Sequence, residues 1–190
     1  MDLLHQHMLM SDLKLDYLRD KALELYDYCL AEGHPAYITQ FIERQLAATP
    51  PPLSLLEMLA DEMQQRLVTL RENHFDLREK IVKVFSQQYQ FDITPLVPAD
   101  QLEAYHRVDA QAILNYASRQ GVQLSTHEQD QLSRIITVSR DTARQLQSDI
   151  KLTANIHQML LDWLYALSIR TVRNESLVIG LTGDHADIVH

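Results

Sequence analysis

The sequence predicts an all-α fold: a helical bundle with two long amphipathic helices and an N-terminal αα-hairpin. The first observation is that 190 residues include only 4 glycines, whereas strands joined by tight turns need glycine for positive φ. The second is an abundance of good helix formers such as Leu, Gln, Ala and Glu. The third is that apolar residues recur three and four positions apart. With 46% hydrophobic residues, the chain can bury a substantial core.

Residues 11–49 predict the N-terminal helical hairpin. Ser11 is placed to cap a helix that ends near Glu32, and Gly33 can supply the left-handed stop. Pro35 favours a restart because proline suits the first helical position. The second helix ends before a run of three prolines. The expected core face of the first helix comprises Leu18, Ala22, Leu25 and Cys29.

Residues 53–173 predict a long-helix bundle. Ser54 and Glu57 have the spacing of a capping box, so the first long helix begins there and runs to about Tyr89. Its apolar positions alternate by four and three residues, which is typical of coiled-coil-like packing. This seam comprises Met63, Leu67, Leu70, His74, Leu77, Ile81 and Val84.

A proline-containing connector at 91–98 then predicts irregular structure. Asp100 can cap a shorter helix that Gly121 ends. The side chains expected to face the core from this helix are Leu102, Tyr105, Val108, Ala112 and Tyr116.

A further capping box, Ser125 with Glu128, opens the second long helix over residues 126–173. Its middle is polar even on the seam, so the helix either bends there or projects past its partners. Residues 174–190 lack helical periodicity and predict a loosely attached tail with at most one edge strand at 177–179. The expected seam is Leu132, Ile135, Ser139, Thr142 and Leu146, then, after a stutter at Ile150, Thr153, His157, Leu160, Leu164, Leu167 and Thr171.

Composition also narrows the functional class. The net charge of −9 argues against a chain that blankets nucleic acid, because phosphate binding needs clustered Lys and Arg. No apolar run approaches the roughly 20 residues that span a bilayer. Cys29 is the single cysteine, so no intramolecular disulfide can form and a reducing compartment is expected. Because residues 1–10 do not resemble a signal peptide, we expect a cytoplasmic protein without a membrane partner.

Metal ligation has only weak candidates. Glu103 and His106 have the Glu-x-x-His spacing of di-iron bundles, which need two such pairs, but the sequence has only this one. His74 and His157 each lie on the seam of a long helix and could meet as a proton or metal switch. The simpler interpretation is that each is a core polar residue that fixes register. We therefore expect neither a metal nor another cofactor.

The leading functional hypothesis is a non-enzymatic adaptor or regulatory module that binds a protein partner and forms a homodimer. A DNA-binding regulator that uses the 12–48 hairpin is the alternative, and a metal-dependent helical-bundle enzyme is a second one. The dimer is expected because the longer helix exceeds its neighbour by about 20 Å at about 1.5 Å per residue. The apolar residues that a second chain would cover are Leu132, Ile135, Ile136 and Leu146.

Overall fold

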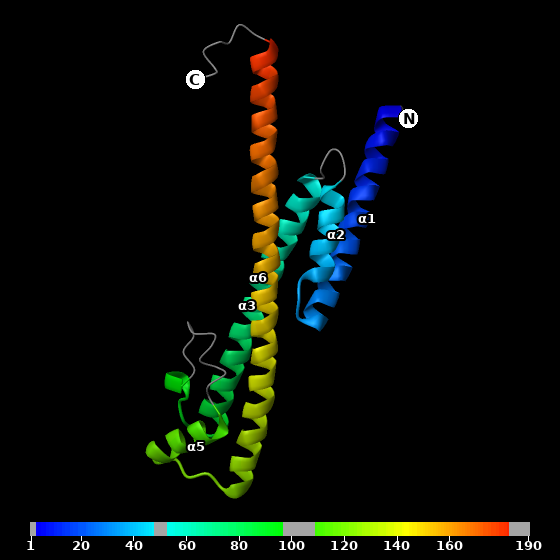
Figure 1. Cartoon of the computed structure of the whole chain (residues 1–190). Coiled ribbons are helices and arrows are strands. Elements are labelled where there is room, and N and C mark those ends of the chain that lie inside the picture. Colours follow the sequence, from blue (N-terminus) through cyan, green and yellow to red (C-terminus); the bar gives the residue numbers. More distant parts are fainter. Residues whose placement is uncertain (1–2, 48–52, 97–108, 183–190) are drawn as a thin grey trace. The chain divides into compact units, whose positions relative to one another are not determined.

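The computed structural model describes residues 3–47, 53–96 and 109–182 of the chain. The helices are α1 (Leu3–Glu32), α2 (Ala36–Leu46), α3 (Leu53–Gln88), α5 (Ala110–Arg119) and α6 (Thr126–Thr182), with a 3-10 turn η1 (Thr94–Leu96) (Figure 1). These ranges contain no strand. The predicted all-α fold, with two long helices and an N-terminal hairpin, is therefore confirmed.

The chain divides into two compact units. Unit 1 comprises Met1–Gln65 and Leu152–His190, and unit 2 comprises Arg66–Lys151. Both boundaries lie inside the long helices α3 and α6, so each long helix contributes residues to both units. The sequence-based division placed its boundaries in loops instead, because loops are where composition changes most visibly along a chain.

Unit 1 has one apolar core to which four helices contribute. Gly33 has φ +77°, and its N–H donates to the carbonyl of Cys29 at 2.8 Å, which confirms the predicted helix stop. The reversal lets α2 pack against α1. The buried members of this core are Ala22, Tyr26, Cys29, Ile38, Phe41, Ile42, Leu55, Leu56, Leu59, Ala60, Met63, Ile156 and Leu160.

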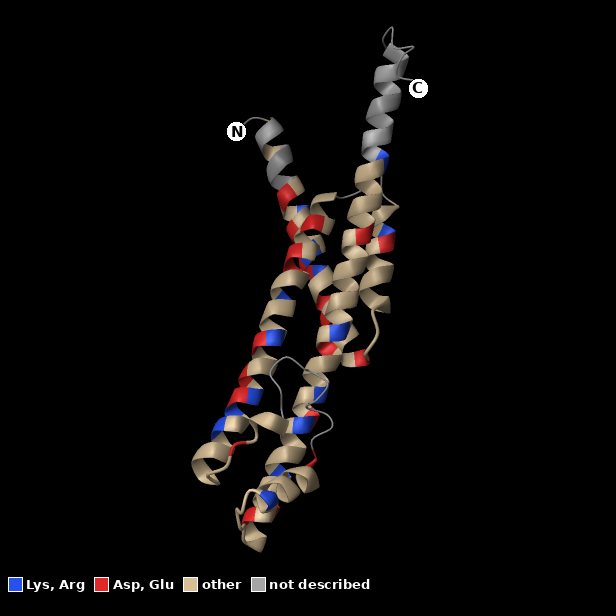
Figure 2. Cartoon of the chain, turned by 90° about the vertical axis from the view of Figure 1, so that its left-hand side faces the viewer, with Lys and Arg blue, Asp and Glu red and all other residues tan. Residues whose placement is uncertain are grey.

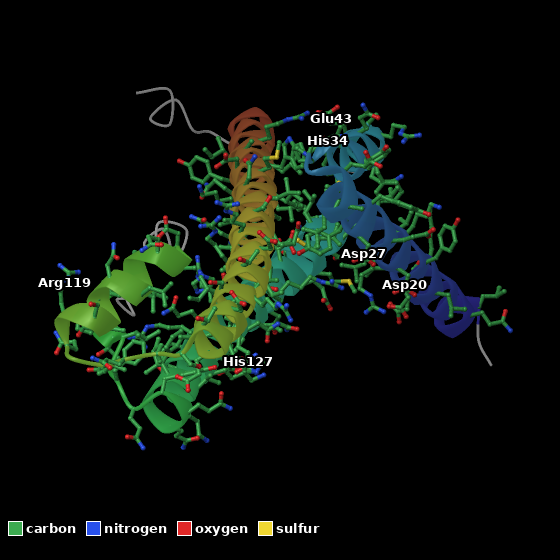
Figure 3. The ribbon with its side chains drawn as sticks, turned by 90° about the horizontal axis from the view of Figure 1, so that it is seen from below. Asp20, Asp27, His34, Glu43, Arg119 and His127 are labelled. Carbon is green, nitrogen blue, oxygen red and sulfur yellow. The ribbon has the colours of Figure 1, made fainter. Side chains whose placement is uncertain are left out.

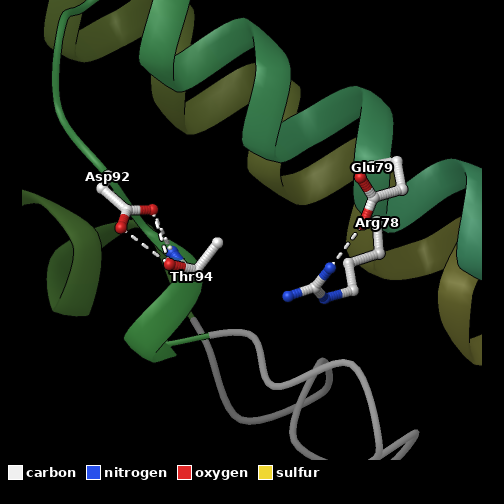
Figure 4. Close-up of polar contacts among 4 residues, drawn as sticks. All are labelled: Arg78, Glu79, Asp92 and Thr94. Carbon is white, nitrogen blue, oxygen red and sulfur yellow. Dashed lines mark hydrogen bonds and ion pairs between the residues drawn. The ribbon is translucent and has the colours of Figure 1, made fainter.

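Unit 2 has a separate core formed by α3, the η1 segment, α5 and α6. The rings of Phe85 and Phe91 meet edge to face, with centroids 5.3 Å apart. The Asp92 carboxylate accepts hydrogen bonds from the Thr94 N–H at 2.9 Å and from its hydroxyl at 2.6 Å (Figure 4). These bonds lower the pKa of Asp92 and fix the turn. The buried members of this core are Ile81, Phe85, Phe91, Ile93, Ile113, Ala117, Leu132, Ile136 and Ala143.

The predicted start at Ser11 and the predicted continuity of one helix up to Gly121 are wrong, whereas the predicted start at Asp100 lies outside the described residues. Helix α1 begins at Leu3, so Ser11 lies inside the helix. Helix α5 begins at Ala110, because Asp109 has extended backbone and its carboxylate accepts from the Ala112 N–H at 2.7 Å. A single helix from Asp100 to Gly121 is thereby ruled out. Three of its expected core residues, namely Leu102, Tyr105 and Val108, lie outside the described residues.

Three further predictions are wrong for α6: the edge strand, the seam register at one position and the stutter. Helix α6 is continuous through Thr182, so the edge strand expected at 177–179 is wrong. The predicted seam register is also wrong at Thr142, which is exposed, whereas Ala143 is buried. Leu132 and Ile150 are both buried and lie eighteen residues apart, about five turns at 3.6 residues each. The helix therefore keeps its ordinary period, and no stutter is needed.

Candidate partner-binding surface

The side of the hairpin that faces away from the core of unit 1 carries large exposed side chains. Ala22 and Cys29 are buried, and residues half a turn away on α1 must point outward. Leu13, Tyr17 and Tyr28 lie there and remain 67%, 66% and 53% exposed. We call Leu13, Tyr17 and Tyr28, together with Tyr37 of α2, the hairpin outer face.

Aromatic contacts order one end of the hairpin outer face. The rings of Tyr28 and Tyr37 are 6.2 Å apart, and the His34 imidazole stacks on Tyr37 at 5.3 Å. His34 follows the tight turn at Gly33, which brings it beside the first turn of α2. Such pairs stabilise beyond the area they bury. The three rings are thus held in place by one another while Tyr37 keeps 41% of its surface exposed.

Carboxylates flank these side chains along α1. Asp16 and Asp20 share the Arg19 guanidinium at 3.7 and 3.3 Å. In Figure 2 several red positions interrupt the helix that starts at the label N. Figure 3 labels Asp20 and Asp27 on one side of α1, as their seven-residue spacing requires. Residues 11–47 hold seven acidic and four basic side chains, a net charge of −3 with His neutral.

The structure places the two seam histidines in different units. His74 is buried in unit 2, as the seam predicted, whereas His157 is half-buried in unit 1. Glu103 and His106 lie outside the described residues. Among the residues that the structure describes, no three His, Cys, Asp or Glu side chains lie close enough together to hold a metal ion.

Cys29 is buried in the core of unit 1. Burial raises the pKa of its thiol, and the opposing backbone hydrogen bonds of Ile38 and Tyr37 do not reverse this direction. A thiol with a raised pKa is a poor nucleophile at neutral pH because little thiolate forms. Cys29 therefore acts as a small apolar core residue.

The predicted dimer interface is partly wrong. Leu132 and Ile136 are buried in the core of unit 2, within their own chain, and so they are not available to a second copy. Ile135 and Leu146 are half-buried. The error has the same source as the register error on α6, because the predicted seam is rotated about the helix axis relative to the residues that are buried in the structure.

One depression in unit 2 lies between α5 and the start of α6 and has a volume of about 440 Å³. Amide side chains dominate its polar lining, and Gln111 donates to Asn115 one turn along α5 at 2.9 Å. No acidic, basic, His, Cys or Tyr side chain lines it, so its lining supplies no side chain of the usual general acids and bases. Its lining residues are Gln111, Leu114, Asn115, Ala117, Ser118, Val122, Gln123, Leu124 and Gln129.

The chain matches no known protein family model, no curated protein and no solved structure. None of the described helices holds a stretch long and apolar enough to cross a membrane.

Sequence reasoning missed the hairpin outer face. A signal for it exists in the sequence, because Leu13, Tyr17 and Tyr28 lie opposite Ala22 and Cys29 on a helical projection of residues 11–32. Large apolar residues on the polar side of an amphipathic helix mark an interaction surface when they adjoin one another.

Proposed function

We propose that this protein is a non-enzymatic interaction module that binds a protein partner through the hairpin outer face. The observation that carries the proposal is the exposure of Leu13, Tyr17, Tyr28 and Tyr37 on the outer side of one helical pair, where Tyr28 and Tyr37 contact each other. Tyrosine is enriched at protein interfaces because it combines a large apolar ring with a polar end. The buried single thiol of Cys29 is compatible with a cytoplasmic location, which belongs to the same proposal.

The charge of the hairpin makes the DNA-binding alternative less favourable. A recognition helix presents Arg, Lys, Asn or Gln to the major groove. The exposed residues of α2 include Tyr37, Gln40, Glu43 and Arg44, so a single basic side chain faces outward there. The acidic row on α1 would repel a phosphate backbone.

We further propose a homodimer that forms through the outward side of α6 in unit 2. Ile135, Val138 and Leu146 are spaced three and eight residues apart and therefore share one side of that helix. Val138 is 66% exposed, and the other two are half-buried. These three residues replace Leu132 and Ile136 in the proposed interface, because Leu132 and Ile136 are buried within their own chain.

Site-specific photocrosslinking tests the interaction module. Benzoylphenylalanine replaces Tyr17 in the full chain inside its native cells, and Phe75, a 49% exposed residue of α3, receives the same group in a control. We expect position 17 to yield a discrete product with another protein, and we expect position 75 not to yield it. Adding Leu13→Ala and Tyr28→Ala should remove the product. Identical products from both positions, or none from position 17, would contradict the proposed function.

A further inference from the structure

We propose that the occupant of the hairpin outer face is a basic amphipathic helix of a partner protein. This inference rests on the proposed function, and it names the chemistry of the partner. Leu13 and Tyr28 lie fifteen residues apart, which corresponds to about 22 Å along α1. That length suits about four turns of a partner helix, whose apolar anchors recur three and four residues apart.

Charge complementarity indicates that the partner helix carries positive charge. Asp20 and Asp27 lie seven residues apart on α1, beside the exposed Tyr17 and Tyr28. Carboxylates therefore border the hairpin outer face over two turns. Asp16 and Asp20 share one guanidinium, that of Arg19, and this arrangement leaves an excess of negative charge. Lys or Arg on the flank of an incoming helix would meet that excess.

The same charges disfavour two other occupants. A second copy of the hairpin in antiparallel orientation would place its own acidic row against Asp20 and Asp27, and like charges that meet across an interface are destabilising. An anionic lipid surface would be repelled for the same reason, because membrane-bound helices of this kind carry Lys and Arg rather than carboxylates.

Tyr17, Tyr28 and Tyr37 also favour a helix with aliphatic anchors. Each tyrosine has few rotatable bonds, and Tyr28, Tyr37 and His34 already contact one another. Little side-chain freedom is therefore lost on binding. Lys21 lies on the flank of α1 opposite Asp20 and Asp27, and it pairs with Glu24 at 3.6 Å between Tyr17 and Tyr28. A partner that carries its basic residues on one flank is therefore expected to bind in one orientation.

The test uses synthetic peptides and the full chain. The first peptide has eighteen residues, with Leu at positions three and four apart and Lys and Arg on one flank. The second has the same composition in scrambled order, and the third replaces Lys and Arg by Glu. Fluorescence anisotropy should show at least tenfold tighter binding of the first peptide than of either other, and the affinity should fall as salt rises.

Variants connect this binding to the surface. Tyr17→Ala should weaken binding of the first peptide about tenfold or more, as hot-spot truncations do. Asp20→Asn combined with Asp27→Asn should weaken it and flatten its salt dependence. Phe75→Ala is the matched control and should leave the affinity unchanged. Circular dichroism must show the same helical signal for every variant.

Equal affinity for the scrambled peptide, or no loss on Asp20→Asn with Asp27→Asn, would overturn the basic-helix proposal. Preferential binding of the Glu peptide would overturn it as well. None of these results would affect a crosslink from position 17 to another protein, so the proposed function is tested separately from the chemistry of its partner.

Discussion

Tyr26 and Thr153 form a hydroxyl pair inside an otherwise apolar core. Their oxygens are 2.6 Å apart, and both residues are buried, one on α1 and one on α6. A buried hydroxyl needs a hydrogen bond, because transfer from water without one costs about 1–3 kcal/mol by mutational data. The pair therefore connects α1 to α6 at one defined position, which a purely aliphatic contact would not specify.

Thr153→Val should lower the free energy of unfolding by about 1 kcal/mol, because it keeps the shape of the side chain but removes this hydrogen bond. Urea unfolding followed by circular dichroism measures the change. Tyr26→Phe and the double variant complete a thermodynamic cycle, and the two losses should not add. Strict additivity would show that the two hydroxyls are not coupled.

The elements could be predicted from the sequence, but their registers could not. Gly33, Gly121 and the Ser125 cap are local signals, and each ends or begins a helix as expected; the Ser125 hydroxyl accepts from the Glu128 N–H at 3.2 Å. The seam of α6 depends on which partner covers each turn, and a heptad pattern and a 3.6-residue pattern differ by only about 20° per seven residues. Nothing local to Thr142 or Ala143 separates the two patterns, so the error accumulated there.

The same reason explains why the predicted dimer interface is partly wrong. Burial of Leu132 and Ile136 depends on α5 and on the Phe91–Ile93 segment, which are distant in sequence and whose packing has no sequence signature. The hairpin outer face was not predicted because the polar side of α1 carries many charged residues and was therefore interpreted as a solvated surface. Tyr17 and Tyr28 lie among those charged residues.

The register of α6 has a direct test in two neighbouring substitutions. Ala143→Leu should destabilise the protein by about 1–3 kcal/mol, because Ala143 is fully buried and a larger side chain in a packed core forces its neighbours to shift. Thr142→Leu should change stability by about 0.5 kcal/mol or less, since Thr142 is exposed. Thermal and urea unfolding of both variants give the comparison. A larger loss for Thr142→Leu would restore the heptad register.

At the scale of the whole molecule, α3 and α6 supply residues to two separate cores. Unit 1 joins the first 65 residues to the last part of the chain, so its core closes only after Ile156 and Leu160 of α6 have been synthesised. Unit 2 lies within a continuous segment and includes the short helix α5. Contacts in unit 1 therefore span most of the chain, and high contact order slows folding.

Self-association is the prediction that concerns the whole molecule. Val138 is 66% exposed on α6 and lies on the same side as Ile135 and Leu146, so a two-fold contact between copies would bury all three. Val138→Asp should split the dimer, because it places a carboxylate in an apolar contact. The fold should survive, since Val138 contributes little to the core of its own unit.

Sedimentation equilibrium measures the mass, and circular dichroism confirms that the variant is helical. Thr69→Asp, at an exposed position of α3, is the control and should remain dimeric. If the wild-type chain sediments as a single 22.0 kDa species at high micromolar concentration, there is no dimer, and Val138 lies on a surface that serves another purpose.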